Sequence, residues 1–237
     1  MAADTQHTEE FYATARGAVA ARLVRERLAL MWPDLARESV LGLGYCGPYL
    51  KLWREQAARC VALTPSRMGE AARWPRGLPN LACVAEEDAL PFPDLSFSRV
   101  LLVHGLESAE STRRMLREIW RVLRDDGALM VVAPNRNGMW ALVESTPFGH
   151  GQPYSAGQID RLLTASLFRA ERRDTALYVP PVNLRMVLRT ANMWEQAGRR
   201  MLPRLAGITI TEAVKDTYAA VPAETVAQRR VVLADAA

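Results

Sequence analysis

Short apolar segments alternate with stretches of helical periodicity over the first 134 residues, and this alternation constrains the fold more than any other feature. The strand-sized apolar segments are 39–43, 60–63, 81–85, 98–104 and 127–133. The clearest helical patterns occupy 8–30, 48–58 and 108–124. Strands and helices that alternate on this scale form parallel βαβ units. We therefore predict an α/β fold with a doubly wound, mostly parallel sheet and an N-terminal helix.

The alternation stops after Pro134. The region contains a long loop, a helix, a strand, a helical insertion and a last strand, predicted over 135–154, 155–167, 169–178, 182–200 and 208–214. Loops as long as the first of these are uncommon in compact domains and are usually functional. The pattern gives no clear prediction for the tail from 216 to 237.

Length, charge and cysteine use narrow the class of protein. A chain of 237 residues predicts one large domain. Its apolar runs are far shorter than the ~20 residues of a membrane span, so we expect no membrane partner. The formal net charge of +4 makes a nucleic-acid partner unlikely. The three cysteines have no metal-ligand spacing, which predicts reduced thiols in a cytoplasmic protein without a metal site.

A glycine-rich turn follows the first predicted strand. Residues 42–47, with the sequence GLGYCG, fit G-x-G-x-x-G between a strand and a helix. Bare backbone lets a ligand approach closely, and a helix N-terminus favours an anionic group. A dinucleotide would require an acid at the end of the next strand, and 61–65 has none. Arg67 could instead meet a 2′-phosphate, so an NADP-dependent reductase stays an alternative, as does a tight turn without a ligand.

Two further stretches carry a family resemblance. The sequence EEDALPFPDLSFS at 86–98 and the sequence MLREIWRVLRDDG at 115–127 flank the fourth predicted strand. Over residues 38–134 the chain resembles the class I S-adenosylmethionine-dependent methyltransferases, in particular the small-molecule branch that includes methyltransferase type 11. The resemblance implies a seven-stranded Rossmann-like sheet and S-adenosylmethionine as cofactor.

The resemblance also implies one methyltransferase-like domain over 1–237. Within it, residues 1–35 would form a helical lid and residues 36–134 the cofactor-binding half. Residues 135–237 would form the substrate-side half, with the helical insertion near 182–200.

The resemblance assigns the cofactor contacts residue by residue. The turn residues Gly42, Leu43, Gly44 and Gly47 would lie along its amino-acid end. Thr64 and Pro65 would lie near the ribose, and Glu86, Glu87 and Asp88 near the adenine. His104 would lie beside the reactive methyl group. The chain departs from the family at Gly42 and Thr64, where the family usually has acids.

Methyl transfer requires a base only when the acceptor starts protonated, as a hydroxyl or an acidic carbon does. His104 is the first candidate for this base and His150, in the long loop, the second, because histidine titrates near neutral pH. Packing under the cofactor is an equal alternative for His104, and a structural loop residue is the simpler interpretation of His150. Candidate substrate contacts are Tyr12, Asn135, Arg136 and Tyr154.

We therefore expect methyl transfer to oxygen or carbon of a small molecule. The sequence 104–107 lacks the Asn/Asp-Pro-Pro-aromatic motif of enzymes that methylate amino groups of bases. A catalytically degenerate member of the fold that binds a partner protein, or forms a homodimer, is the alternative. We also expect a branched side chain at Gly44 to abolish ligand binding, while the fold survives if the turn can relax.

Overall fold

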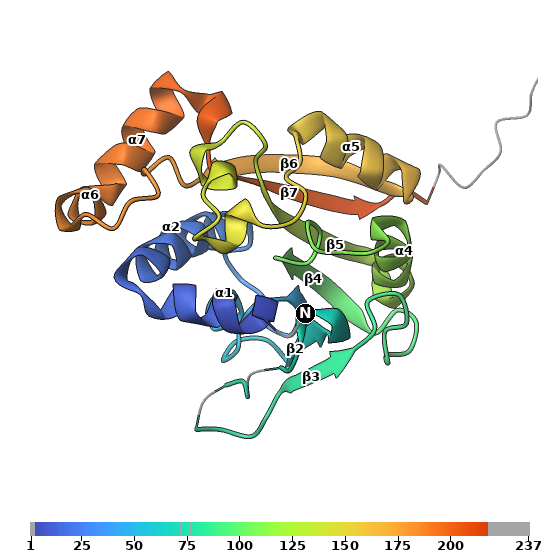
Figure 1. Cartoon of the computed structure of the whole chain (residues 1–237). Helices are drawn as coiled ribbons and strands as arrows, with labels where there is room; N and C mark the ends of the chain where they lie inside the picture. The colour runs from blue at the N-terminus through green and yellow to red at the C-terminus, as the bar shows by residue number, and fades with distance from the viewer. Residues whose placement is uncertain (1–2, 72, 76, 218–237) are drawn as a thin grey trace, which may run out of the picture.

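The computed structural model describes residues 3–71, 73–75 and 77–217. Seven strands form one sheet in the order β3-β2-β1-β4-β5-β7-β6 (Figure 1). Their bounds are β1 Ser39–Gly44, β2 Arg59–Pro65, β3 Ala82–Ala85, β4 Phe97–Val103, β5 Leu123–Pro134, β6 Phe168–Ala176 and β7 Ile208–Lys215. The first five strands pair in parallel, and β7 is antiparallel to both β5 and β6. The predicted doubly wound, mostly parallel fold is confirmed.

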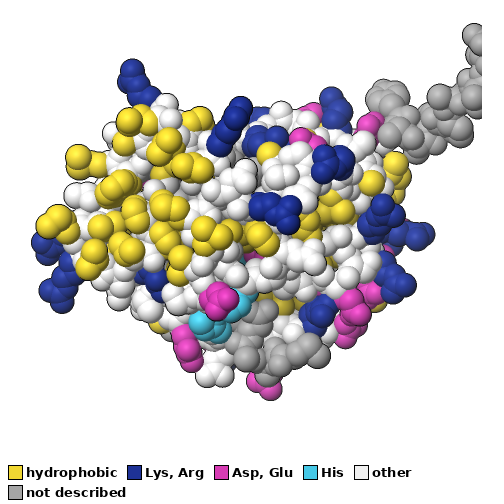
Figure 2. Space-filling model, turned by 45° about the horizontal axis from the view of Figure 1, so that its top comes forward, with side chains coloured by type: hydrophobic (Ala, Val, Ile, Leu, Met, Phe, Trp, Pro, Cys, Tyr) yellow, Lys and Arg dark blue, Asp and Glu magenta, His cyan; other side chains and the backbone are white. Residues whose placement is uncertain are grey.

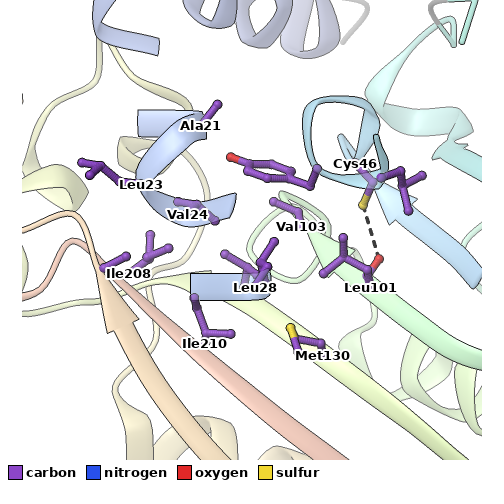
Figure 3. Packing of buried hydrophobic residues seen from close by; sticks show 14 of the residues in the cluster. Ala21, Leu23, Val24, Leu28, Cys46, Leu101, Val103, Met130, Ile208 and Ile210 are labelled. Carbon is purple, nitrogen blue, oxygen red and sulfur yellow. Dashed lines mark hydrogen bonds between the residues drawn. The ribbon is translucent and has the colours of Figure 1, made fainter. Parts of the chain in front are cut away.

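Helices cover both faces of the sheet. The α-helices are α1 Ala3–Ala13, α2 Ala15–Met31, α3 Gly47–Leu50, α4 Thr112–Val122, α5 Ala156–Ala165, α6 Arg185–Arg189 and α7 Ala191–Met201. The 3₁₀ turns are η1 Ser66–Met68, η2 Met139–Leu142, η3 Pro147–Gly149 and η4 Pro203–Leu205. Leu28 of α2 packs with Val103 and Met130 on one face (Figure 3), whereas Ile119 of α4 packs with Val131 on the other. The predicted helical insertion is α6 and α7, which project beyond the sheet in Figure 1.

The N-terminal region forms two helices where one helix over 8–30 was predicted. Thr14 interrupts the helix because its hydroxyl accepts a hydrogen bond from the backbone N–H of Gly17 at 3.0 Å and caps α2. The junction is tight, since a Cβ on Gly17 would lie 2.0 Å from the carbonyl oxygen of Phe11. This break turns α1 onto the carboxyl ends of the central strands (Figure 1).

Three other predicted boundaries are wrong. The helix expected over 48–58 is only the four-residue α3, followed by turns. The helix expected over 108–124 ends at Val122, because the buried Leu123 pairs with Phe97 of β4 and so begins β5. Tertiary pairing here overrides helix propensity. The insertion predicted over 182–200 divides into two helices at Thr190.

None of the helices in the described part of the chain is both long and apolar enough to cross a membrane.

A buried carboxylate ties α2 to the antiparallel edge of the sheet. Glu212 on β7 accepts a hydrogen bond from the indole N–H of Trp32 at 2.7 Å. Its second oxygen pairs with Arg172 of β6, whose guanidinium also donates to the carbonyl of Met31 at 2.6 Å. The C-terminal end of α2 is therefore held by a charged network of which Glu212 is the centre.

We expect Glu212→Ala to lower the free energy of unfolding by about 3 kcal/mol, because it leaves a buried indole N–H and a guanidinium without their acceptor. Urea denaturation followed by circular dichroism measures this loss. Glu171→Ala on the same sheet edge is the control, since its pair with Arg169 is solvent-exposed and contributes less than about 1 kcal/mol. Equal losses for the two variants would contradict a central role for Glu212.

Candidate active site at the carboxyl ends of the strands

The glycine turn lies where β1 meets β4. Gly44 has a φ of +93°, and a Cβ there would lie 2.1 Å from the carbonyl oxygen of Val103. The next residue, Tyr45, donates its backbone N–H to the same oxygen at 2.9 Å. Gly44 is thus required by the contact between two strands, and a branched residue there would fit only if this contact opened.

The other two glycines of the motif also face side chains of the protein. A Cβ on Gly42 would lie 2.6 Å from Leu50, and a Cβ on Gly47 would lie 3.2 Å from the indole of Trp74. Trp74 also donates its indole N–H to the carbonyl of Gly47 at 3.1 Å. Leu43 is fully buried in the core. Packing therefore accounts for much of the glycine pattern from which a ligand was inferred.

A cavity of about 530 Å³ nevertheless opens over this turn. Its wall combines the turn, the ends of β2 and β3, the helices α1 and α2, and the segment around Trp74. The lining residues are Thr5, Glu9, Tyr12, Ala13, Ala18, Ala21, Arg25, Gly44, Tyr45, Cys46, Gly47, Pro48, Lys51, Ala62, Thr64, Arg73, Trp74, Pro75 and Ala82. We call it the turn cavity. It brings together four of the predicted contacts, namely Gly44, Gly47, Thr64 and Tyr12, and its size suits a nucleoside-like ligand.

Three cationic side chains among the described residues line the turn cavity. Arg25 comes from α2 and donates to the carbonyl of Pro48 at 3.2 Å, and partial burial lowers the pKa of its guanidinium. Lys51 follows α3, and burial lowers the pKa of its ammonium group. Arg73 lies in the segment before Trp74. The sequence motifs did not point to these residues. Arg25 and Arg73 lie on segments that carry no ligand motif, and Lys51 was assigned only to a helix.

Tyr12 lies at the centre of a buried hydrogen-bond chain. Its hydroxyl is 2.6 Å from the hydroxyl of Tyr49 and 2.8 Å from Nε2 of His104. Its ring stacks on Tyr45, with centroids 5.3 Å apart. Burial, and then the neighbouring Tyr49, raise the pKa of Tyr12 well above its ordinary value. The side chain is therefore a neutral phenol that closes the turn cavity from the side of α1.

The chain of hydrogen bonds continues beyond His104. This residue follows β4 with a φ of +55°, uncommon for a residue with a side chain, and only 4% of its surface is exposed. Its Nδ1 is 3.1 Å from Oε1 of Glu107. The other oxygen of Glu107 is buried and has no hydrogen-bond partner in the described part of the protein. Glu107 was not among the predicted site residues. Its position three residues after His104 was the sequence signal for the contact between the two side chains.

A second cavity, of about 260 Å³, lies on the other side of His104. We call it the histidine cavity; its lining residues are Thr8, Met68, His104, Glu107, Ser108, Pro147, His150 and Gly151. The long loop reaches it through Gln152, whose backbone N–H donates to the carbonyl of Glu107 at 3.0 Å. The two candidate bases therefore line one space, and the ring of His150 lies 5.0 Å from that of His7.

The predicted adenine contacts lie in a third hollow, of about 360 Å³. Its lining residues are Arg67, Glu86, Glu87, Asp88, Glu110, Ser111 and Arg114. Glu87 accepts the backbone N–H of Glu110 at 2.8 Å, and burial raises the pKa of its carboxyl group. Glu86 accepts a hydrogen bond from the hydroxyl of Ser66 at 2.6 Å.

The remaining predicted contacts lie outside these three spaces. Asn135 donates its amide to the carbonyls of Arg204 and Ala206 at 3.0 and 2.8 Å, so it joins the end of β5 to the segment before β7. Arg136 is exposed, and its backbone N–H donates to the carbonyl of Tyr154 at 3.1 Å. Gly42 and Pro65 are buried next to the turn cavity without lining it.

Sequence comparisons match part of this chain to methyltransferases. The family model described as a methyltransferase domain matches residues 40–131, from β1 through most of β5. A demethylmenaquinone methyltransferase of Thermus thermophilus is 31% identical over 135 residues, which cover 56% of this chain and 54% of that protein. An uncharacterized protein of Mycobacterium tuberculosis is 31% identical over 143 residues, which cover 57% of this chain and 50% of that protein. The chain thus spans about half the length of these curated relatives.

Solved structures share the fold. A SAM-dependent methyltransferase from Thermotoga maritima superposes with a TM-score of 0.65 at 16% identity, over 90% of this chain and 97% of that one. The methyltransferase bound by the Trm112 activator of Haloferax volcanii gives a TM-score of 0.58 at 20% identity, over 90% of this chain and 95% of that one. Residues 40–131 therefore match a methyltransferase domain, and the chain has the fold of S-adenosylmethionine-dependent methyltransferases.

Proposed function

We propose that this chain transfers a methyl group from S-adenosylmethionine to oxygen or carbon of a small molecule, with the cofactor in the turn cavity. The observation that carries the proposal is the 530 Å³ space over the turn between β1 and α3, a turn that lies within the matched methyltransferase domain. Ligands of open α/β sheets bind at the carboxyl ends of the strands, where this cavity lies.

The chemistry of the cavity wall fits the cofactor that this family uses. The cofactor's carboxylate is an anion, and Arg25 and Lys51 supply cations beside the turn. Its sulfonium is a cation, which aromatic faces such as those of Tyr45 and Trp74 attract. Thr64 offers a hydroxyl at the end of β2, where the family usually has an acid. The protein would therefore bind the cofactor's carboxylate mainly through the side chains of Arg25 and Lys51, and less through the backbone of the glycine turn.

The cofactor supplies an activated methyl group, and the protein's task is to align the acceptor and to exclude water. The histidine cavity, on the other side of His104, is the space we propose for the acceptor. A carboxylate at Glu107 only accepts hydrogen bonds, so Nδ1 of His104 carries the proton and Nε2 is the acceptor for the phenol of Tyr12. For His104 to act as a base, the acceptor must replace Tyr12 at Nε2.

A non-catalytic, protein-binding role is the second candidate. It is favoured by the packing of Leu50 and Trp74 against two of the motif glycines, together with the missing acids at Gly42 and Thr64. One structural neighbour is itself bound to a protein activator. The reductase alternative loses its support, because Arg67 lies among four carboxylates that would repel a 2′-phosphate.

Isothermal titration with S-adenosylhomocysteine tests the cofactor proposal. We expect binding to the wild-type chain, weakened about fivefold by Lys51→Gln through the loss of a partly exposed ion pair worth about 1 kcal/mol. Arg113→Gln, an exposed charge on α4, is the control and should bind like the wild type. Absence of heat at millimolar ligand would favour the protein-binding role instead.

The tautomer of His104 is a separate prediction that needs no substrate. Nitrogen-15 chemical shifts should show His104 with its proton on Nδ1, and Glu107→Gln should change this pattern because an amide can also donate. The chain has three histidines, so His104→Gln identifies the signal. A proton on Nε2 in the wild-type protein would rule out the proposed role of Glu107.

A further inference from the structure

The inward side of α7 is fixed by buried polar contacts. Glu195 accepts the backbone N–H groups of Tyr178 and Val179 at 2.6 and 3.3 Å. Gly198 lies against Tyr178, so closely that a Cβ would be 2.5 Å from it. Arg199 pairs with Asp174 at 2.9 Å. The orientation of the helix is therefore defined, and so is the set of side chains that it turns to solvent.

That outward side carries an apolar stripe beside exposed polar residues. Met193, Ala197 and Met201 are exposed and four residues apart, which places them on one stripe of the helix. The flanking segments extend the stripe, and 79% of Met186 is exposed. We define the insertion surface as the exposed side chains of Leu184, Met186, Met193, Trp194, Met201, Leu202 and Leu205. Figure 2 shows hydrophobic side chains gathered on the side of the molecule where α6 and α7 lie in Figure 1.

The exposed charges of the insertion segment itself all have one sign. Between 182 and 205 the exposed charged residues are Arg185, Arg189, Arg200 and Arg204. The single acid of this segment is Glu195, which is buried beneath α7. Large apolar patches are rare on monomeric soluble proteins and mark interaction sites. An occupant must therefore offer both an apolar surface and negative charge.

A second copy of the chain does not meet this requirement. In a symmetric dimer the same patch meets itself, so the arginines of both copies would approach one another without a compensating acid in the segment. A bilayer with anionic lipids offers both properties, because apolar side chains enter the headgroup boundary while arginines pair with lipid phosphates. The projection of α6 and α7 beyond the sheet allows contact with such a flat surface (Figure 1).

We propose that the insertion surface docks the protein onto the surface of an anionic lipid bilayer. The expectation that the chain has no membrane partner rested on the lack of a spanning segment, and surface docking requires none. The proposal is independent of the cofactor site, because none of the residues of the insertion surface lines the turn cavity or the histidine cavity.

Flotation of the full chain with vesicles tests the proposal. We expect binding to vesicles that contain phosphatidylglycerol, weaker binding to pure phosphatidylcholine, and loss of binding at high salt. Arg185→Gln combined with Arg200→Gln should lower the partition coefficient about twenty-five-fold, at about fivefold for each arginine. Met193→Gln combined with Met201→Gln should lower it at least about tenfold through the lost apolar contact.

A charge-matched control separates docking from general attraction. Arg113→Gln combined with Arg117→Gln removes the same charge from the exposed side of α4 and should leave binding unchanged. Brominated lipids should quench the wild-type fluorescence more than that of Trp194→Phe. Thermal melting by circular dichroism checks that each variant is folded.

Three results would overturn the proposal. The first is no flotation with anionic vesicles at low salt. The second is an equal loss of binding in the α4 control. The third is a dimer in light scattering that Met193→Gln with Met201→Gln dissociates, which would assign the surface to a second copy.

Discussion

The hydrogen bond between Tyr12 and His104 joins the N-terminal helix to the end of β4 and links the walls of both candidate cavities. Tyr12 lines the turn cavity and His104 lines the histidine cavity, while Tyr49 and Glu107 complete the chain of hydrogen bonds on either side. Burial keeps the phenol neutral. Opening of this bond would free Nε2 of His104, which the proposed methyl transfer from the turn cavity to the histidine cavity requires.

The glycine turn shows how a ligand motif and a packing motif can coincide. Gly44 has no side chain because the carbonyl of Val103 occupies that position, and Gly47 has none because Trp74 lies against it. The same backbone forms one wall of the turn cavity, so the tight packing brings bare peptide to the cavity edge. With no acids at Gly42 and Thr64, Arg25 and Lys51 are charged groups that line the same cavity as the turn.

Much of the fold could be predicted from the sequence, because buried parallel strands are continuous apolar runs such as 98–104, and these matched β4 closely. The predicted helix boundaries were wrong where tertiary contacts or helix capping determine them. Leu123 leaves α4 because it pairs with Phe97, and Thr14 breaks the first helix by capping the next. The site was predicted only in part, because it too depends on contacts between residues distant in the sequence. No local pattern shows that Arg25 of α2 lies in the wall of the turn cavity.

A crystal structure with S-adenosylhomocysteine measures directly whether the cofactor occupies the turn cavity. We predict electron density for the ligand between the turn at Gly44–Gly47, Thr64 and Trp74, with its carboxylate toward Arg25 or Lys51. Density in the hollow that holds Glu86–Asp88 alone, or a turn cavity that stays without ligand at saturating concentration, would contradict the account.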